Sequence, residues 1–520
     1  MDQASPRSRT ARVAAVAALL AASVLLSRLL GYLREVVIAY QLGATPAADA
    51  YRAAFQIPDL LNQLLAAGAF SIAFLPLYTR ARTEQGEAAA EELLAVVFGT
   101  MTGVAAALTL ILWVAAEPLV ELQFPRFDAE QKALVARLTR IVLPGQVCFV
   151  AGGLIRAALM ARDRFATQAL APLLYNAGII AGGLLGAGQG AEGFAWGALA
   201  GAALGQLVLA VADVRSAGLR LRWRFAPRDP RFLGYLLTAA PLMLGMSLLT
   251  VDEWYERWFG ALLASGSVAQ LAYARQLMLL PVAVVGQAVA TAALPTFARL
   301  ASEGRSEELG STLEATLRAA LGFAILAAAA LAVLAEPTVA VVFERGRFTA
   351  ADTAAVASIL RVLACAVPAW VVQQIAVRAF FARGDTWRPM LLGTALAVTA
   401  LPLYLTLGPR YGVEGLAAAG ALGVAANALA TLLLGRRLHG APRLLPLAAS
   451  ALRSVLAAGV GAAAALAAAR APLAGGALVE LAIGGAAFAL AGGAAILVFG
   501  DAATRRALVR IGARLRRLAR

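Results

Sequence analysis

VAAEPLVELQF at residues 114–124 and VLAEPTVAVVF at residues 333–343 are two copies of one pattern, set 219 residues apart. Other residues repeat at offsets of 219–223: Arg52 with Arg275, Pro58 with Pro281, Pro76 with Pro295, Arg80 with Arg299, Glu84 with Glu303, Arg140 with Arg361, and Arg156 with Arg378. The chain is therefore predicted to be an internal duplication. Two homologous halves around a cavity at the membrane midplane are the architecture of many transporters.

Apolar residues dominate the chain. Hydrophobic residues make up 61% of its 520 residues and charged residues 14%, whereas charged residues are about 25% of a typical soluble protein. A membrane-spanning helix needs about 20 apolar residues. The polar breaks predict an all-α polytopic fold of about fourteen spans, near residues 10–40, 50–79, 90–116, 133–161, 167–187, 193–213, 232–262, 267–298, 311–335, 352–382, 388–407, 413–435, 448–469 and 475–499. The first has no A-x-A-like cleavage site and is interpreted as a retained helix rather than a signal peptide.

Arginines orient these spans. They crowd every second loop, whereas the alternate loops hold few or mixed charges. By the positive-inside rule we expect a multi-pass membrane protein with both termini in the cytoplasm. The formal net charge of +15 is attributed to cytoplasmic loops that face anionic membrane lipids. Nucleic acid is therefore not an expected partner.

Six spans in each repeat give the two halves the same orientation. The predicted organisation is an N-lobe at 1–213 (helices 1–6), a basic cytoplasmic linker at 214–231, a C-lobe at 232–437 (helices 7–12), helices 13 and 14 at 438–500, and a basic cytoplasmic tail at 501–520. The last two helices are rich in Ala and Gly, which suits either a packing or lipid-facing pair or a groove for a lipid tail. The tail is interpreted as an amphipathic or polybasic membrane-surface segment.

The residue patterns of soluble catalysts are missing from the sequence. The single histidine, His439, lies in a basic loop, and Cys148 and Cys365 are isolated within apolar spans. Such cysteines fit buried small side chains better than a disulfide or a metal site. The sequence contains no G-x-x-x-x-G-K-[ST] motif for nucleotide phosphates. We therefore predict no enzymatic activity and no cofactor, and a driving force from the membrane potential, a coupling ion or the substrate gradient.

Charged residues inside the spans are the candidates for function. Arg28, Arg34 and Glu35 lie within the first span. A charge at the bilayer centre costs about 2.5–3.5 kcal/mol, so these side chains are expected to face a wet cavity or an ionic partner. Arg28 and Glu35 are seven residues apart and could simply pair on one helix face.

Two further charges follow in the second span. Asp49 suits either the cavity or a helix cap, because it opens an apolar run. Arg52 recurs as Arg275, which favours a shared cavity position, although both could also snorkel to the membrane interface.

The seventh predicted span, 232–262, carries an unusual cluster near its end, Asp252, Glu253, Glu256 and Arg257. Glu253 and Arg257 have the spacing and order of a favourable ion pair. Asp252 and Glu256 are like charges one turn apart. They are interpreted either as a cation-binding or proton-coupling site, or as part of a salt-bridge network between the lobes.

The stretch SRLLGYLREVVIAYQLGATPAADAYRAAFQIPDLLNQLLAAGAFSIAFLPLY at 27–78 resembles the N-terminal signature of the MurJ/MviN family of lipid II flippases, within the multidrug/oligosaccharidyl-lipid/polysaccharide exporter superfamily. Further matching segments are FATQALAPLLYN (165–176), ASGSVAQLAYARQLMLLPVAVVGQAVATAALP (264–295), FERGRFTAADT (343–353) and FFARGDTWRP (380–389). The resemblance implies fourteen helices in two lobes. It also implies that an undecaprenyl-pyrophosphate-linked disaccharide-peptide moves from the cytoplasmic to the periplasmic leaflet during peptidoglycan biosynthesis, on which cell wall biogenesis and cell shape depend. By the same match, Arg28, Arg34 and Asp49 belong to a cationic cavity that binds the pyrophosphate.

The sequence departs from the family pattern at two cavity positions. Asn62 stands where the family usually has an arginine, and Gln276 takes the place of another, with Arg275 one residue earlier. One step along a helix turns a side chain by about 100°, so the cavity is expected to be less basic at both places. Arg52, Arg275 and Arg257 are candidates to restore the positive charge. Another polyprenyl-pyrophosphate-linked glycan is therefore an alternative cargo.

Alternating access is the expected mechanism. Guanidinium groups match the oxygens of a pyrophosphate in bidentate fashion, so Arg28 and Arg34 would hold the head group while the polyprenyl tail stays among the membrane lipids. Two other classes remain: a cation-coupled drug antiporter that uses the carboxylates at 252–256, and a membrane scaffold that recruits cell-wall synthesis proteins through its basic tail.

Overall fold

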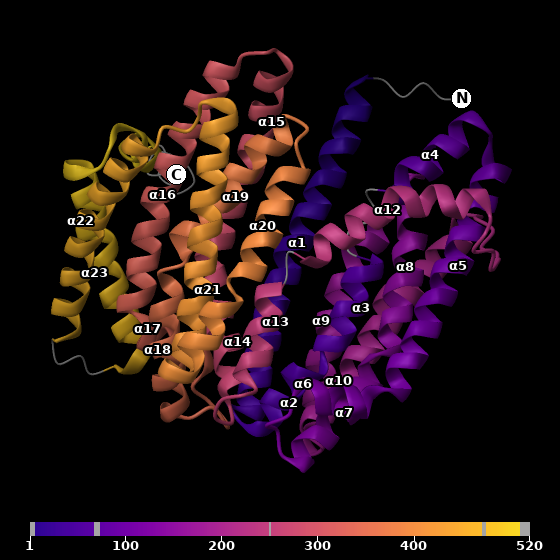
Figure 1. Cartoon of the computed structure of the whole chain (residues 1–520), viewed down its shortest axis with the longest axis horizontal. Helices are drawn as coiled ribbons and strands as arrows, with labels where there is room; N and C mark the ends of the chain where they lie inside the picture. Colours follow the sequence, from indigo (N-terminus) through magenta and orange to yellow (C-terminus); the bar gives the residue numbers. More distant parts are fainter. Residues whose placement is uncertain (1–5, 67–72, 249–250, 471–474, 510–520) are drawn as a thin grey trace. The chain divides into compact units, whose positions relative to one another are not determined.

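The computed structural model describes residues 6–66, 73–248, 251–470 and 475–509, and its chain divides into two compact units, Met1–Thr250 and Val251–Arg520 (Figure 1). The helices of unit 1 are α1 (Pro6–Leu42), α2 (Pro46–Ala54), α3 (Gln56–Ala66), α4 (Leu75–Glu84), α5 (Glu87–Val114), α6 (Ala116–Gln123), α7 (Ala129–Val142), α8 (Pro144–Met160), α9 (Ala166–Leu185), the 3-10 turn η2 (Ala187–Gln189), α10 (Ala191–Gly201), the π-helix η3 (Ala202–Val208), α11 (Leu209–Ser216) and α12 (Pro230–Leu248). The helices of unit 2 are α13 (Val251–Gly260), α14 (Ser267–Pro281), the π-helix η4 (Val282–Gln287), α15 (Ala288–Ser302), α16 (Ser306–Val333), α17 (Ala335–Phe343), α18 (Ala350–Ala364), α19 (Val367–Ala382), α20 (Trp387–Thr399), α21 (Leu401–His439), α22 (Leu444–Ala469) and α23 (Gly476–Phe499). All regular elements among these described residues are helical, which confirms the all-α prediction.

Nine helical stretches of the described residues are long and apolar enough to cross a membrane, and a bent pair, Ala350–Ala364 with Val367–Ala382, makes a tenth. One of the nine, Trp387–His439, has 53 residues, or about 80 Å of helix, against a hydrocarbon core of about 30 Å. Gly412 interrupts it with non-helical angles, φ 62° and ψ −138°. The stretch therefore holds the two predicted spans 388–407 and 413–435. The total of fourteen stays a prediction.

The internal duplication is visible in the order of helices. In unit 1, α5 and α6 are followed by α7 and α8; in unit 2, α16 and α17 are followed by α18 and α19, with nearly the same lengths. Both repeats place a capping side chain at the same point, because Asp128 caps α7 and Thr349 caps α18. Both also keep an arginine–glutamate pair, with Nη–Oε distances of 2.8 Å for Arg140–Glu117 and 3.5 Å for Arg361–Glu336.

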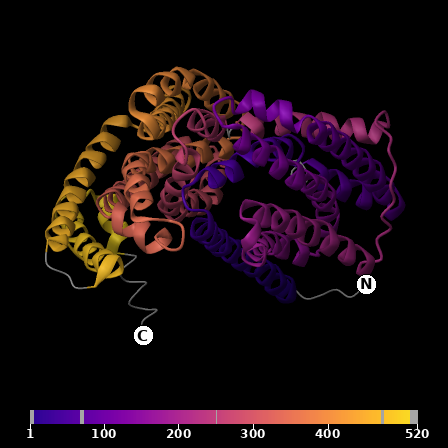
Figure 2. The same cartoon turned by 90° about the horizontal axis from the view of Figure 1, so that it is seen from below.

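An extended segment follows the surface of α5 in unit 1 and leads into α12 (Figure 2). The amide N of Arg224 donates to the carbonyl oxygen of Ala95 at 3.3 Å, and the amide N of Ala226 donates to Thr100 Oγ1 at 3.0 Å. A Cβ on Gly99 would lie 2.5 Å from the backbone of Arg224. The glycine therefore provides the space in which this part of the basic segment lies against the helix.

The core of unit 1 lies where α3, α4, α5, α8 and α12 pack together. Large aromatic side chains fill it, among them Phe74, Tyr78 and Tyr235, all fully buried. The rings of Phe74 and Tyr235 meet edge to face with centroids 6.2 Å apart. Burial of aromatic rings contributes large apolar area, so α12 is held to unit 1 by the same contacts that form its core.

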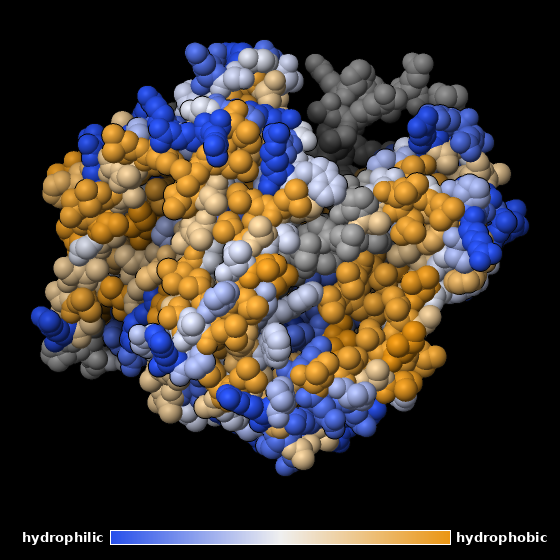
Figure 3. Space-filling view, viewed as in Figure 1, coloured by the Kyte–Doolittle hydropathy of each residue, from blue (hydrophilic) through white to orange (hydrophobic). Residues whose placement is uncertain are grey.

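In unit 2, α22 and α23 pack along each other, and α22 also packs along α16. Their outward faces carry exposed apolar side chains, including Leu445, Leu452, Leu478 and Leu490. Figure 3 shows hydrophobic residues over much of the surface of unit 2 on this face. Because apolar surface of this extent is favourable in contact with lipid, the outward faces of α22 and α23 are suited to the bilayer.

Candidate functional site

Two of the predicted cationic residues of unit 1, Arg34 and Arg52, meet at one carboxylate, that of Glu35 on α1. Arg34 donates from Nη2 to Glu35 Oε1 at 2.8 Å, and Arg52 on α2 forms an ion pair with Glu35 Oε2. The Glu35 side chain is 2% exposed, that of Arg52 17% and that of Arg34 27%. Two guanidinium groups and one carboxylate leave a net positive charge of one in this cluster. Since a buried charge is costly unless it is paired, Glu35 explains how both arginines are accommodated.

Helix α9 completes the surroundings of Arg34. Nη1 of Arg34 donates to Asn176 Oδ1 at 3.1 Å, and the Asn176 amide donates to the carbonyl oxygen of Pro172 at 3.0 Å. The Asn176 side chain is therefore fixed in the orientation that presents its oxygen to the guanidinium. Of the three groups in this cluster, Arg34 is the most exposed, so it is the best placed to bind an anion.

The other predicted residues of unit 1 lie on α1, α2 and α3. Arg28 is exposed on α1, two turns before Glu35, and Asp49 is 1% exposed on α2. Thr45 occupies the N-cap position of α2, so the alternative in which Asp49 caps this helix is wrong. Asn62 on α3 donates from Nδ2 to Gln146 Oε1 on α8 at 2.9 Å. A neutral pair of amides thus stands where the family pattern has an arginine.

Unit 2 contains a second buried ion pair. Arg275 on α14 donates from Nε to Glu256 Oε2 on α13 at 2.8 Å, and its Nη2 bonds Oε1, so the contact is bidentate. The side chains are 14% and 6% exposed. Gly420 on α21 makes room for the carboxylate, because a Cβ there would lie 3.1 Å from Glu256 Oε1. Tyr404 on α21 and Phe259 on α13 stack beside the pair, with ring centroids 5.8 Å apart.

The remaining predicted residues of unit 2 lie on the same two helices. Glu253 and Arg257 are half-buried on α13, and Gln276 is half-buried on α14 beside Arg275. The side chain of Asp252 lies outside the described residues. Glu256 therefore forms an ion pair with Arg275 of its own unit, whereas the salt-bridge alternative had expected a network between the lobes.

Sequence reasoning did not single out Arg156 or Asn176 for a contact. Arg156 on α8 donates from Nη1 to the carbonyl oxygen of Gln206 at 3.1 Å and from Nε to Gln168 Oε1 at 3.2 Å. Gln206 lies in the π-helix η3, whose wider turn leaves carbonyl groups without their usual partners. The repetition of Arg156 as Arg378 was the only sign of a structural role in the sequence. The contact with η3 could not be predicted, because a π-helix has no clear signature in a single sequence.

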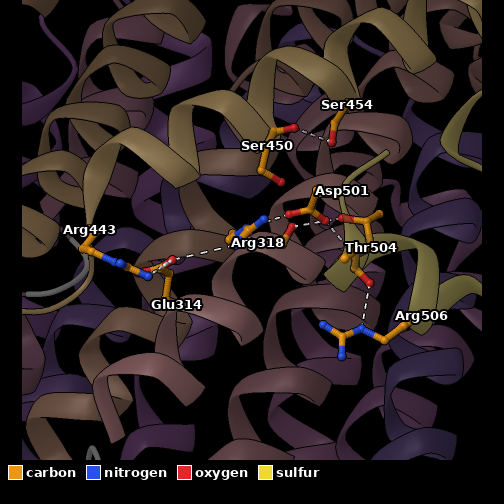
Figure 4. A network of polar contacts seen from close by, with 9 residues as sticks. Glu314, Arg318, Arg443, Ser450, Ser454, Asp501, Thr504 and Arg506 are labelled. Carbon is orange, nitrogen blue, oxygen red and sulfur yellow. Dashed lines mark hydrogen bonds and ion pairs between the residues drawn. The ribbon is translucent and has the colours of Figure 1, made fainter. Parts of the chain in front are cut away.

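A third polar network joins three parts of unit 2 and is shown in Figure 4 (Figure 4). Glu314 on α16 accepts from Arg443 Nε, at the start of α22, at 3.0 Å, and lies 3.8 Å from Arg318 Nη1. Arg318 donates from Nε to Asp501 Oδ2 at 2.6 Å. Asp501 Oδ1 accepts from the Thr504 amide at 2.8 Å and so caps the helical segment 502–509.

Burial alone would raise the pKa of Asp501, but the hydrogen bonds from Thr504 and Arg318, together with the positive charge of Arg318, outweigh it and hold the pKa below its ordinary value. The carboxylate is therefore ionised at neutral pH, and the network fastens the beginning of the predicted basic tail to α16. Residues 510–520 of that tail lie outside the described residues.

No group of three or more His, Cys, Asp or Glu side chains in the described ranges could hold a metal ion. Cys148 is half-buried and Cys365 exposed, and neither is in a disulfide within the described chain. The clusters above are instead suited to recognising an anion through guanidinium groups.

The fold belongs to a class of multi-pass membrane transporters. A solved structure described as lipid II flippase MurJ in an inward closed conformation matches with a TM-score of 0.78 at 21% identity, over 92% of this chain and 98% of that chain. An inward-facing multidrug resistance MATE family transporter of the MOP superfamily matches with a TM-score of 0.68 at 17% identity, over 79% and 94% of the two chains. At these identities the likeness shows the fold.

The sequence narrows the class to one family. The family profile described as lipid II flippase MurJ matches residues 38–483. The probable lipid II flippase MurJ of Rhizobium meliloti is 32% identical over 412 residues, which cover 78% of this chain and 77% of the relative. That of Bdellovibrio bacteriovorus is 30% identical over 451 residues, which cover 84% and 85%. The chain belongs to the MurJ family of lipid II flippases, which confirms the resemblance found in the sequence and the class of transporter rather than enzyme.

Proposed function

We propose that this chain carries lipid II, the undecaprenyl-pyrophosphate-linked precursor of peptidoglycan, from the cytoplasmic to the periplasmic leaflet. The observation that carries the proposal is the family match over residues 38–483, which includes Arg52 and all of α2 and begins three residues after Glu35 on α1. A lipid-linked pyrophosphate needs cationic groups at membrane depth, and such groups are rare and functional in membrane proteins.

The chemistry of recognition is assigned to Arg34 and Arg28. Arg34 has one edge on Glu35 and remains 27% exposed, so its guanidinium can accept a second anion without leaving its partner. Arg28, exposed on the same helix, supplies a further positive charge two turns away. Asp49 and Asn62 in unit 1, and Gln276 in unit 2, are proposed as further substrate-binding residues. Charge-assisted bidentate contacts favour phosphate oxygens over neutral sugar hydroxyls.

The proposed cycle is alternating access in the bacterial inner membrane, with both termini in the cytoplasm. The head group enters a cationic cavity while the polyprenyl tail remains in lipid. Transfer of one net charge couples to the membrane potential at about 2.3 kcal/mol per 100 mV, so the potential or a coupling ion is the proposed driving force. Cell-wall synthesis proteins that supply or consume lipid II are the proposed protein partners.

Replacement of the essential lipid II flippase in a depletion strain tests the proposal. Cells that produce this chain should grow and should expose lipid II on the outer leaflet. Arg34→Ala should abolish both without loss of membrane-inserted protein. Arg80→Ala is the matched control, because Arg80 is 73% exposed and pairs with Glu84 on the surface of α4. It should behave like the unmodified chain.

Two results would count against this function. A correctly inserted chain that leaves lipid II on the inner leaflet would contradict lipid II as the cargo. Full activity in both Arg28→Ala and Arg34→Ala would contradict the role assigned to these arginines.

A second cargo is favoured by one observation, the neutral Asn62–Gln146 contact on α3 and α8. A cavity with fewer guanidinium groups suits a smaller or less highly charged head group on the same polyprenyl-pyrophosphate carrier. Failure to replace the lipid II flippase, combined with export of another polyprenyl-linked glycan, would favour this cargo. A cation-coupled drug antiporter would instead use Glu253 and Glu256, and resistance assays would detect it.

A further inference from the structure

The two repeats share a structural device at their first helical hairpin. In each unit the first hairpin turns at a glycine with positive φ, Gly43 at 62° and Gly266 at 89°. These glycines are 223 residues apart, the same offset that separates Arg52 from Arg275. A left-handed backbone strongly favours glycine, so both hairpins turn at a residue of the same kind, Gly43 directly after α1 and Gly266 directly before α14.

Each hairpin carries one buried glutamate on its first helix and one largely buried arginine on its second. Glu35 and Arg52 join α1 to α2, and Glu256 and Arg275 join α13 to α14. The glutamates are 221 residues apart. Both carboxylates are almost fully buried, at 2% and 6% exposed, and both arginines are less than one-fifth exposed. The ion pair is therefore duplicated, together with the hairpin that contains it.

The local charges separate the roles of the arginines. The Glu256–Arg275 pair is bidentate and carries no net charge. In unit 1, Arg34 and Arg52 share Glu35, and Arg34 is the more exposed of the two. Glu256 occupies both Nε and Nη2 of Arg275, so this arginine has fewer donors left for a phosphate.

We infer that Glu35–Arg52 and Glu256–Arg275 are equivalent clamps that hold each repeat's first two helices as one rigid hairpin. Arg52 and Arg275 are positioning residues, and the pyrophosphate is bound by other cationic groups, of which Arg34 is the best placed. This inference rests on the proposed function. It requires that the hairpins α1–α2 and α13–α14 each move as a body, with bending confined to elements outside them.

The π-helix η4 directly after α14 is a suitable place for that bending. Pro281 closes α14, and η4 follows from Val282 to Gln287. Proline removes a backbone hydrogen bond, and π-helical turns occur frequently at functional sites in helices. The clamp at Arg275 thus lies on the hairpin side of the weakened segment.

The test uses the full chain and the variants Glu256→Gln, Arg275→Gln and the double variant. Each single substitution leaves a buried charge without its partner and should lower transport by about tenfold or more. The double variant removes both charges and leaves two neutral amides, the one at 256 equal in size to glutamate and the one at 275 shorter than arginine, so it should fold and recover transport to within about threefold of the unmodified chain. It should bind lipid II with unchanged affinity.

Arg34→Gln provides the contrast. It removes a proposed phosphate ligand, so adding Glu35→Gln should not restore transport. Arg305→Gln and Glu308→Gln are the matched controls. They apply the same substitutions to an exposed pair on unit 2, 47% and 56% exposed and 2.6 Å apart between Nη2 and Oε2. Each should change transport by about twofold or less.

Two results would overturn the inference. If the double variant still fails to bind lipid II, Arg275 is a ligand of the cargo. If thermal unfolding of the purified variants shows additive effects of the two substitutions, the residues form no clamp. The unfolding cycle needs no cargo, so it tests the clamp even if the unmodified chain does not move lipid II, a result that would refute only the proposed function.

Discussion

Asp501→Asn should loosen the C-terminal helical segment 502–509 while leaving its cap in place. Asp501 has two roles: Oδ1 accepts the Thr504 amide, and Oδ2 accepts from Arg318 Nε of α16. Asparagine caps helices about as well as aspartate, so this substitution removes the ion pair and keeps the cap. Asp501→Ala removes both interactions.

The size of the effect follows from burial. The Asp501 side chain is 1% exposed, but Arg318 is 28% exposed. Loss of one partner of a fully buried pair costs about 3–5 kcal/mol, whereas an exposed pair contributes about 0.2–1 kcal/mol. For this half-buried case we expect about 2 kcal/mol from the ion pair. Loss of the cap adds about 1 kcal/mol in Asp501→Ala.

Amide hydrogen exchange of residues 502–509 measures this free energy directly, because exchange from a helix follows its local opening equilibrium. With tenfold for each 1.4 kcal/mol, Asp501→Asn should speed exchange about 30-fold and Asp501→Ala about 150-fold. Arg506→Gln is the control on the same segment, because Arg506 Nε donates within its own helix to the Ala502 carbonyl oxygen at 2.9 Å. It should change exchange by about twofold or less.

These outcomes distinguish the contribution of the helix cap from that of the Asp501–Arg318 ion pair. If Asp501→Asn exchanges like the unmodified protein and Asp501→Ala does not, the cap alone holds the segment and the ion pair contributes nothing. If neither variant exchanges faster, the reasoning from burial is wrong.

Two further predictions concern acid and close packing. Because the folded pKa of Asp501 lies below its ordinary value, its stabilisation is complete above about pH 4, the pKa of an unfolded aspartate, and is lost as the pH falls through the folded value. Exchange of 502–509, corrected for its intrinsic pH dependence, should therefore rise only below about pH 4, and Asp501→Asn should remove that rise. In unit 1, Gly152→Ala places a Cβ 1.8 Å from the Gln206 carbonyl oxygen and should lower stability by about 1–3 kcal/mol. Gly234→Ala, with open space around it, is the control in thermal unfolding, and equal midpoints for the two variants would contradict the steric argument.

Much of the fold could be predicted from the sequence, because the membrane imposes simple rules. Apolar length alone marks spans such as α5 and α16, and their boundaries lie within a few residues of the prediction. The duplicated pattern at 114–124 and 333–343 anticipated the matching helices α6 and α17. Gly412 shows the limit of this approach: the break in Trp387–His439 was visible as a gap between apolar runs, whereas its left-handed backbone was not.

The candidate site was predictable in its residues and much less so in its pairings. Arg34, Arg52 and Glu256 could be selected because charged side chains at membrane depth are costly and are usually paired or functional. Which carboxylate meets which arginine depends on how helices cross, and that is set by packing of residues such as Gly420 on a distant helix. Spacing along one helix suggested Arg28 as the partner of Glu35, whereas the structure brings Arg52 from the next helix and Arg34 from the adjacent position.

The paired arginines also bear on the half of the proposed cycle in which no cargo is bound. A carrier has to return empty, and a closed cavity with several unpaired guanidinium groups would carry the desolvation cost of each one. A carboxylate held beside Arg52, and another beside Arg275, lowers that cost in every state because each pair lies within one hairpin and need not be broken as the lobes move. The net charge of the Glu35 cluster then remains available for the pyrophosphate. A cavity built in this way binds the anion through few unpaired groups, which favours release on the far side over very tight binding.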